Sequence, residues 1–181
     1  LRSSHAGPRR PADWNELCPS TARATNVTTV CLRGDPDSDT PLERELLSRE
    51  TAREALATYD LSRPFHDTVA AETVSLGAAV ALCNDLDWYL TRFVDETLLR
   101  APSVAPDEWL SRALATAIRN ERIDPEATGG YLRVYGLRGD RLLEPMYLAR
   151  DNDGDRPSYD LHDVDDTVVV RVTESEFTGS R

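Results

Sequence analysis

The sequence predicts a single α+β domain, with a mixed α/β arrangement as the alternative, built from roughly five strands and three or four helices. Runs rich in Val and Thr, typical of strands, occur near the start, in the middle and near the end of the chain, and helical patterns lie between them. The chain has 181 residues, 40% of them hydrophobic, which is enough to build one core. We expect this domain to span residues 27–177, with a short tail at 178–181.

The first 26 residues differ from the rest of the chain. They carry four Arg against two acidic residues, contain three Pro and show no apolar periodicity. The pair Arg9-Arg10 is not followed by the apolar run that an export signal requires. We expect residues 1–26 to be a disordered or non-native extension, and the native chain to begin at or near Val27.

The domain itself begins with a buried strand, predicted at about 27–33. Thr40, with Glu43 three residues later and a Pro at the first helical position, forms a capping box and predicts a helix start. A second possible start lies at Ser48. Segment 41–58 is therefore either one helix or a short turn followed by a second helix, and both remain open.

The middle of the chain predicts a second strand and two helices. Residues 67–74, rich in Val and Thr, predict the strand. Ser75 then caps a long central helix that we expect to run to about Leu99, a length of about 36 Å. Another helix is expected to begin at residues 106–108, where acidic side chains favour the helix dipole, and to place Trp109 on its apolar side.

The last part of the domain predicts β-structure. Breaks at 124–130 end the helical region. Segments 131–137 and 142–149, joined by an Arg-Gly-Asp turn, predict a C-terminal hairpin, and Pro145 indicates that its second strand lies at an edge or carries a bulge. A Val-rich run at 167–173 predicts a final buried strand.

The charge balance points to a habitat and excludes some partners. The chain carries 32 acidic residues against 21 basic ones, all of them Arg, for a net charge of −11. A GC-rich genome explains the lack of Lys but not the excess of acid. An acidic surface suits concentrated salt, because at about 1 M ionic strength a Debye length of about 3 Å screens the repulsion.

We therefore expect a soluble, halophilic, cytoplasmic protein; the alternative is an ordinary acidic actinobacterial protein. Nucleic acid is not an expected partner, because no basic face is present to neutralise phosphates. No membrane is expected either, since no apolar run approaches the ~18 residues that a spanning helix needs.

The most informative position is Trp88, a large aromatic residue on the polar face of the expected long helix. Asn84, Asp85, Arg92 and Asp95 share that face. One interpretation is a ligand- or partner-binding patch in which Trp88 is a platform and Arg92 binds an anion or carboxylate. The other is that a second element covers this face, so that Trp88 belongs to the core.

Motifs of known catalytic or metal chemistry are missing: the sequence has no GxSxG, P-loop, GxGxxG or HExxH pattern. The run 151–155 is similar to a calcium loop but lacks the Gly and Glu that an EF-hand needs. With seven Asp and one Arg, segment 151–166 is interpreted as a solvated loop. Cys18, Cys31 and Cys83 are far apart and are expected to be reduced and mostly buried. We expect no metal, cofactor or catalytic residue.

Five stretches resemble an uncharacterised family of small haloarchaeal proteins. They are 47–56 (LSRETAREAL), 74–80 (VSLGAAV), 84–90 (NDLDWYL), 107–112 (DEWLSR) and 168–177 (VVVRVTESEF). The resemblance extends over most of 27–177 and leaves the first 26 residues unmatched. It implies no activity, cofactor or site residue, but it supports the halophilic interpretation and the late start.

The function predicted from these observations is binding of a protein partner or small ligand without catalysis. The alternative is an enzyme or ligand sensor with a pocket around Trp88, Arg92 and Asp95. A closed pocket with a shifted carboxylate would favour the enzyme. A flat, exposed apolar patch would favour partner binding.

Overall fold

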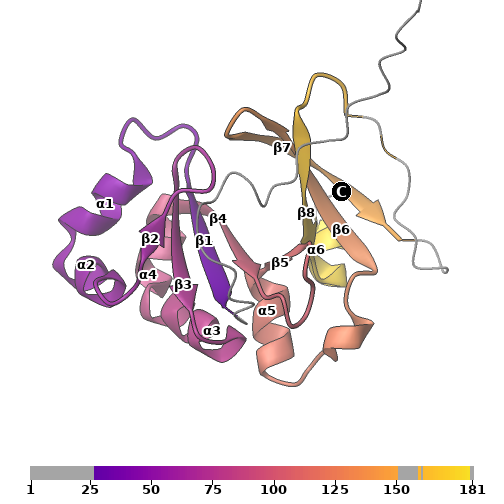
Figure 1. Cartoon of the computed structure of the whole chain (residues 1–181), viewed down its shortest axis with the longest axis horizontal. Coiled ribbons are helices and arrows are strands. Elements are labelled where there is room, and N and C mark those ends of the chain that lie inside the picture. The colour runs from indigo at the N-terminus through magenta and orange to yellow at the C-terminus, as the bar shows by residue number, and fades with distance from the viewer. Residues whose placement is uncertain (1–26, 151–158, 160, 180–181) are drawn as a thin grey trace, which may run out of the picture.

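The computed structural model describes residues 27–150, 159 and 161–179. Its centre is an eight-stranded mixed sheet with the strand order β2-β3-β1-β4-β5-β8-β6-β7 (Figure 1). The strands are β1 (Thr28–Gly34), β2 (Leu61–Ser62), β3 (Thr68–Thr73), β4 (Val94–Arg100), β5 (Trp109–Ser111), β6 (Tyr131–Arg138), β7 (Arg141–Ala149) and β8 (Asp166–Arg171). The helices are α1 (Leu42–Ser48), α2 (Glu50–Leu56), α3 (Leu76–Asp85), α4 (Asp87–Phe93), α5 (Arg112–Arg119) and α6 (Glu174–Gly179), with a 3-10 turn η2 (Pro125–Ala127). The α+β class is confirmed, whereas the expected five strands are too few.

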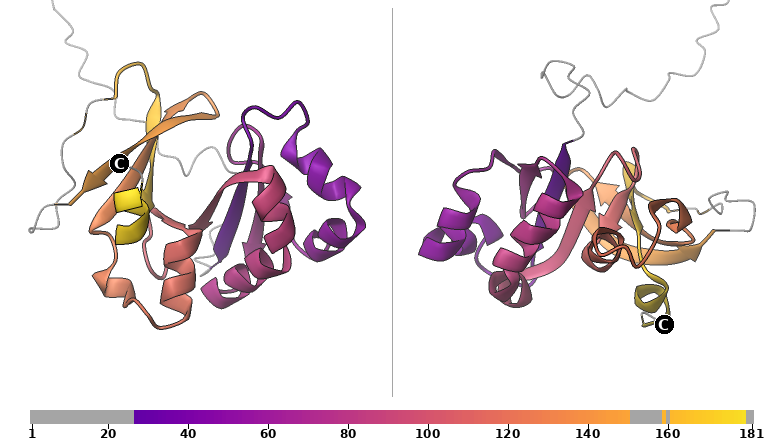
Figure 2. Two further views of the ribbon diagram at one scale, coloured as in Figure 1. Left: turned by 180° about the vertical axis from the view of Figure 1, so that it is seen from behind. Right: turned by 90° about the horizontal axis from the view of Figure 1, so that it is seen from below.

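Helices α1–α5 bury their apolar side chains against one face of the sheet. Seen from behind, α3, α4 and α5 lie in front of the strands (Figure 2). The strands send Val30, Leu99 and Leu110 into this larger core. Because side chains alternate along a strand, the neighbouring Cys31 and Leu98 point to the opposite face. That opposite face carries the site described below.

Strand β5 joins two halves of the sheet: β2, β3, β1 and β4 form the first half, and β8, β6 and β7 form the second (Figure 1). It is only three residues long. It pairs with β4 antiparallel at Ser111 and Leu110, and with β8 in parallel at Trp109 and Leu110. The sheet is therefore continuous only near the residues of β5. Away from β5, no strand pairing among the described residues joins the two halves.

The sheet twists strongly across this junction. One row of paired residues crosses four strands: Leu99 on β4, Leu110 on β5, Arg171 on β8 and Leu132 on β6. Glu96 precedes this row on β4, whereas Tyr135 follows it on β6, which runs in the same direction. In a flat sheet the two would lie about 20 Å apart along the strands and about 14 Å apart across them. They nevertheless share a hydrogen bond, because accumulated strand twist brings opposite corners of the sheet together.

The long central helix predicted from Ser75 to Leu99 is wrong. Ser75 does cap a helix, accepting a hydrogen bond from the Ala78 amide, but α3 ends at Asp85. After α4 the chain continues as β4, which pairs with β1 from Val94 onward. Leu98 and Leu99 are both fully buried, on opposite faces of the sheet. This pairing with a distant strand outweighs the local helical pattern.

The helix predicted from residues 106–108 is also wrong at its start. Trp109 and Leu110 belong to β5, and the helix begins at Arg112, where the Ser111 side chain accepts a hydrogen bond from the Leu114 amide. Pairing of β5 with β4 and β8 again overrides a local helix signal.

Segment 41–58 forms two short helices, separated at Arg49, whose backbone is extended. The predicted capping box at Thr40 is wrong, because no side chain of that segment caps α1. The Asp67 carboxylate instead accepts a hydrogen bond from the Leu42 amide at 2.8 Å. A residue distant in sequence thus fixes the start of α1.

The remaining strand predictions are confirmed. Strands β1, β3 and β8 lie close to their expected bounds, and β6 and β7 form the predicted hairpin. Pro145 lies on the edge strand β7, opposite a register shift in β6. Cys31 and Cys83 are buried and free, as expected. The predictions for residues 1–26, Cys18 and 151–158 lie outside the described residues.

Candidate functional site

A cleft of about 870 Å³ lies over the face of the sheet opposite α1–α5. We use "the cleft" for the cavity lined by these residues: Arg33, Asp35, Pro36, Ser38, Asp39, Pro41, Glu43, Arg63, Phe65, His66, Asp67, Thr68, Asp95, Glu96, Arg133, Tyr135, Asp140, Arg141, Leu142, Leu143, Glu144, Pro145 and Tyr147. Its walls come from both halves of the sheet. The first half contributes β1, β3, β4 and nearby loops, and the second contributes the β6–β7 hairpin.

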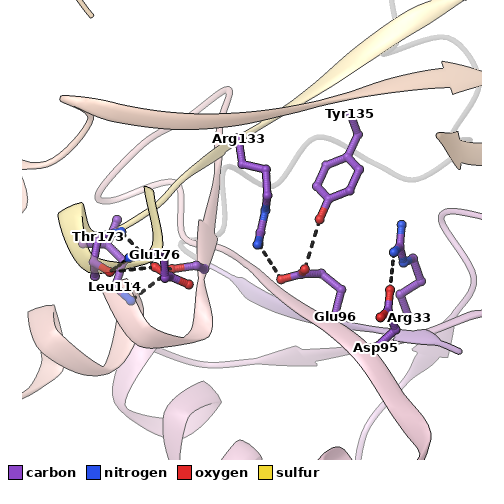
Figure 3. A network of polar contacts seen from close by, with 9 residues as sticks. Arg33, Asp95, Glu96, Leu114, Arg133, Tyr135, Thr173 and Glu176 are labelled. Atoms are coloured by element: carbon purple, nitrogen blue, oxygen red, sulfur yellow. Dashed lines mark hydrogen bonds and ion pairs between the residues drawn. The ribbon is translucent and has the colours of Figure 1, made fainter. Parts of the chain in front are cut away.

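A buried polar group, the Glu96 cluster, connects the two walls. It consists of Glu96 on β4 and of Arg133 and Tyr135 on β6, which both reach toward the carboxylate (Figure 3). Arg133 forms an ion pair with Glu96 at 2.5 Å, and the Tyr135 hydroxyl donates a hydrogen bond to its other oxygen at 3.0 Å. The side chain of Arg133 is 9% exposed and that of Glu96 is 17% exposed.

The protonation states of the Glu96 cluster follow from its burial. Burial raises the pKa of Glu96, against the opposing influence of Arg133 and of the Tyr135 hydrogen bond. Burial and the neighbouring carboxylate both raise the pKa of Tyr135, so its phenol stays a hydrogen-bond donor. Burial lowers and Glu96 raises the pKa of Arg133, and the net shift is upward. The guanidinium is therefore a permanent cation in the deep part of the cleft.

A second arginine extends the cluster. Arg33 on β1 pairs with Asp95 on β4 (Figure 3). Its guanidinium lies 5.4 Å from the centre of the Tyr135 ring, and that of Arg133 lies 5.6 Å from the same ring, so both make cation–π contacts. The Nε atoms of Arg33 and Arg133 are buried and have no hydrogen-bond partner among the described residues. The deep end of the cleft thus has unused hydrogen-bond donors.

The outer part of the cleft carries excess acid. The whole lining contains eight carboxylates against four Arg. Arg63 on the rim pairs with Glu43, whereas Arg141 forms no ion pair with a described residue. Five carboxylates likewise form no ion pair with the described part of the chain: Asp35, Asp39, Asp67, Asp140 and Glu144. Four of these five, all but Asp67, are exposed.

Comparison with known proteins identifies a family. The model of a family of unknown function (DUF5804) matches residues 28–137. The chain belongs to this family. The matched range contains Arg33, Glu96, Arg133 and Tyr135, so these residues at the deep end of the cleft lie within the part of the chain that the family model matches. No match was found among curated proteins or among solved structures.

The five residues that the sequence singled out are only partly brought together in this DUF5804 protein. Asn84, Asp85, Trp88 and Arg92 are exposed on α3 and α4. Asp95 lies instead on β4, where it lines the cleft. Their role in binding stays a prediction.

Trp88 is 54% exposed, so its interpretation as a core residue is wrong. Its ring contacts Tyr89 and Phe93 edge-on, at 5.0 and 6.1 Å between ring centres. The Arg92 guanidinium lies 5.2 Å from the Trp88 ring. The two residues therefore bind each other and form a small aromatic patch outside the cleft.

The sequence did not single out the Glu96 cluster, although one signal was present. In segment 131–137, Leu132 and Val134 alternate with Arg133 and Tyr135. Both sets are buried, which places a charged residue inside a strand that is covered on both faces. A buried arginine needs a partner, but the partner, Glu96, lay in a segment assigned to a helix.

A second buried ion-pair cluster lies away from the cleft. Glu108, 5% exposed, pairs with Arg150 and with Arg171, the latter at 2.5 Å. Arg171 also donates a hydrogen bond to Thr128 at 2.8 Å. This cluster ties β8, and Arg150 just after β7, to the segment before β5. Among the described residues, no three His, Cys, Asp or Glu side chains are arranged to hold a metal ion.

Proposed function

We propose that this DUF5804 protein binds a small polar ligand in the cleft and does not turn it over. The observation that carries the proposal is the cavity of about 870 Å³ above the Glu96 cluster. Ligand pockets typically measure about 300–1,000 Å³ and combine apolar walls with a few convergent polar groups. Phe65, Leu142 and Tyr147 supply such walls here.

Binding without turnover is supported by the hydrogen bonds of Glu96 and Tyr135 and by the protonation of Cys31. Glu96 is occupied by two partners, and Tyr135 donates its only proton to it. Cys31 lies on the same face of the sheet, but burial raises the pKa of its thiol to about 12, so it is a poor nucleophile.

The test is a thermal-shift screen of small polar metabolites, followed by NMR titration of the compounds that stabilise the protein. A ligand is expected to shift the resonances of β6 and β4 residues in the cleft, and Arg33→Gln is expected to weaken its binding, because Arg33 lines the deep end of the cleft. Arg119→Gln is the matched control, because Arg119 is exposed on α5 and does not line the cleft. The proposal fails if no compound shifts a cleft resonance, or if both variants weaken binding equally.

An enzyme is the second candidate, favoured by one observation. Glu96 is a carboxyl with a raised pKa that faces a cavity, which is a frequent property of general acids and bases. In that case Glu96 and Tyr135 would transfer a proton to or from the ligand. Incubation of a bound compound with the wild-type protein, followed by mass spectrometry, distinguishes the two: a product that Glu96→Gln does not form would establish catalysis.

We further infer that the protein is salt-adapted and cytoplasmic, and that the family is haloarchaeal. Its 32 acidic residues, with Arg as the only strong base, support this inference. No described helix is long and apolar enough to cross a membrane. Unfolding in dilute buffer and recovery in molar salt are expected, and full stability in dilute buffer would count against salt adaptation.

A further inference from the structure

The two ends of the cleft differ in charge. At the deep end, the guanidinium groups of Arg33 and Arg133 are largely buried, with side chains 18% and 9% exposed. At the outer end, Asp35, Asp140 and Glu144 are exposed and form no ion pair with a described residue. Donors are thus in excess inside, and negative charge is in excess outside.

At the deep end, the Nε hydrogens of Arg33 and Arg133 lack an acceptor among the described residues. The two oxygens of Glu96 already accept hydrogen bonds from other groups, one from the terminal nitrogen of Arg133 and the other from the Tyr135 hydroxyl. The Nε hydrogen of Arg133, whose side chain is more than nine-tenths buried, has no partner in the described part of the chain. A buried donor without a partner destabilises the folded protein. A carboxylate or carbonyl oxygen entering from the cleft, with a small movement of Arg133, would satisfy it.

The outer end would repel a simple anion. With eight carboxylates and four Arg in the lining, the cleft has a formal charge of −4 when His66 is neutral. A phosphate or a simple carboxylate would have to pass this rim without compensation. A positive group on the ligand would instead be attracted to the rim acids. Phe65, Leu142 and Pro145 add apolar surface to the lining of the cleft.

From this arrangement, which rests on the proposed function of the cleft, we propose that the ligand is a small zwitterion. Its carboxylate lies at the deep end, against Arg33 and Arg133, and its ammonium group lies at the outer end, among Asp35, Asp140 and Glu144. A short hydrocarbon segment between the two charges lies against the apolar lining residues Phe65, Leu142 and Pro145. Amino acids with the amine at the far end of the chain have this chemistry.

The experiment uses three matched series of probes on the full chain. The first contains unbranched ω-amino acids of increasing length, the second the alkylamines and the third the alkyl carboxylates of the same lengths. Binding is followed by NMR, including the Nε–H resonances of the arginines. We expect the best ω-amino acid to bind at least about tenfold more tightly than either partner of the same length, since it uses both ends of the cleft. It should also shift the Nε–H resonances of Arg33 and Arg133.

Variants at the rim test the orientation. Asp140→Asn combined with Glu144→Gln should weaken the ω-amino acids and the alkylamines, and should leave the carboxylates unchanged or bound more tightly. Asp85→Asn is the matched control, since Asp85 is exposed on α3 outside the cleft. Its affinities should equal those of the wild-type protein.

The outcomes separate this inference from the proposed function. If a carboxylate or inorganic phosphate binds as tightly as the best ω-amino acid, the zwitterion is wrong, although a ligand site exists. The zwitterion is equally wrong if none of the three series binds while another compound of the metabolite screen shifts cleft resonances. If no compound at all shifts them, the proposed function itself is wrong.

Discussion

Tyr135→Phe tests whether the Glu96 cluster holds the two halves of the sheet together in solution. The substitution removes one oxygen atom and leaves the ring, which is 1% exposed, in place. The lost contact is the hydrogen bond of 3.0 Å from the hydroxyl to Glu96. Because the donor is on β6 and the acceptor on β4, this bond joins the halves at a point where the sheet itself does not.

The size of the effect follows from the charge and burial of the acceptor. A hydrogen bond to a charged group contributes about 1.5–3 kcal/mol, and one between neutral groups about 0.5–1.5 kcal/mol. Glu96 is 17% exposed and keeps Arg133 as a partner, so we expect a loss of about 1.5 kcal/mol, at the low end of that range. In a Glu96→Gln background the acceptor is neutral, and the same substitution should cost about 0.5 kcal/mol. The coupling between the two positions is then about 1 kcal/mol.

The assay is urea unfolding followed by far-UV circular dichroism, on the wild type, both single variants and the double variant. Tyr131→Phe is the matched control, because Tyr131 is also on β6 and its hydroxyl has no hydrogen bond to a described residue. It should change the free energy of unfolding by less than about 0.5 kcal/mol. If Tyr135→Phe costs no more than this control, or if the cycle shows no coupling, the hydrogen bond from Tyr135 to Glu96 does not hold the halves together in solution and the reasoning fails.

Three further predictions concern stability. Gly34→Ala should lower the free energy of unfolding in urea by about 2–3 kcal/mol, because the new Cβ would collide with the Asp67 carboxyl that fixes the start of α1. Gly130→Ala is the control and should cost under about 0.5 kcal/mol, because no atom lies within 4 Å of its new Cβ. Equal costs of the two substitutions would contradict this reasoning. Burial raises the pKa of Glu96 in the folded state, so the stability that this carboxyl contributes is complete below its ordinary pKa of 4.5 and is lost as the pH rises through the folded pKa. The difference in unfolding free energy between the wild type and Glu96→Gln should therefore fall with increasing pH. A difference that rises with pH would show that the folded pKa of Glu96 is lowered. Trp88→Ala should lower the free energy of unfolding by less than about 1 kcal/mol and should remove a fluorescence component typical of an exposed tryptophan. A loss of several kcal/mol in unfolding free energy would mean that another element covers Trp88.

The parts of the fold that could be predicted are those fixed by local chemistry. Ser75 is a helix cap because of its own hydroxyl, and the hairpin turn follows from Gly139, whose φ of +61° favours glycine. The two wrong helices share a different origin. Leu98 and Leu110 lie in segments with helical periodicity, but their neighbours in space come from other parts of the chain. Pairing with a distant strand cannot be derived from periodicity alone.

The site was less predictable than the fold for the same reason. Asp95 was the only one of the five selected residues that lines the cleft. Its neighbour Glu96 faces Arg133, 37 residues away in sequence, and the sheet twist that joins them is a property of four strands together. The prediction of the polar face on α4 was locally sound, since Trp88 and Arg92 do share it. The local pattern placed a charged residue, Arg133, inside a buried strand, but it did not indicate the partner across the sheet.

The cost of the Glu96 cluster is itself an argument for its function. Replacing a buried ion pair by apolar side chains of similar volume is often neutral or stabilising, by about 1–4 kcal/mol. An apolar cluster at these positions could therefore join the halves of the sheet at least as well, and it could fill the cavity between them. The chain instead keeps Arg133 and Tyr135 buried around the partly buried Glu96, with an arginine Nε that has no partner among the described residues. Because stability alone does not require such a group, its presence at the deep end of a cavity supports the proposal that a ligand binds there.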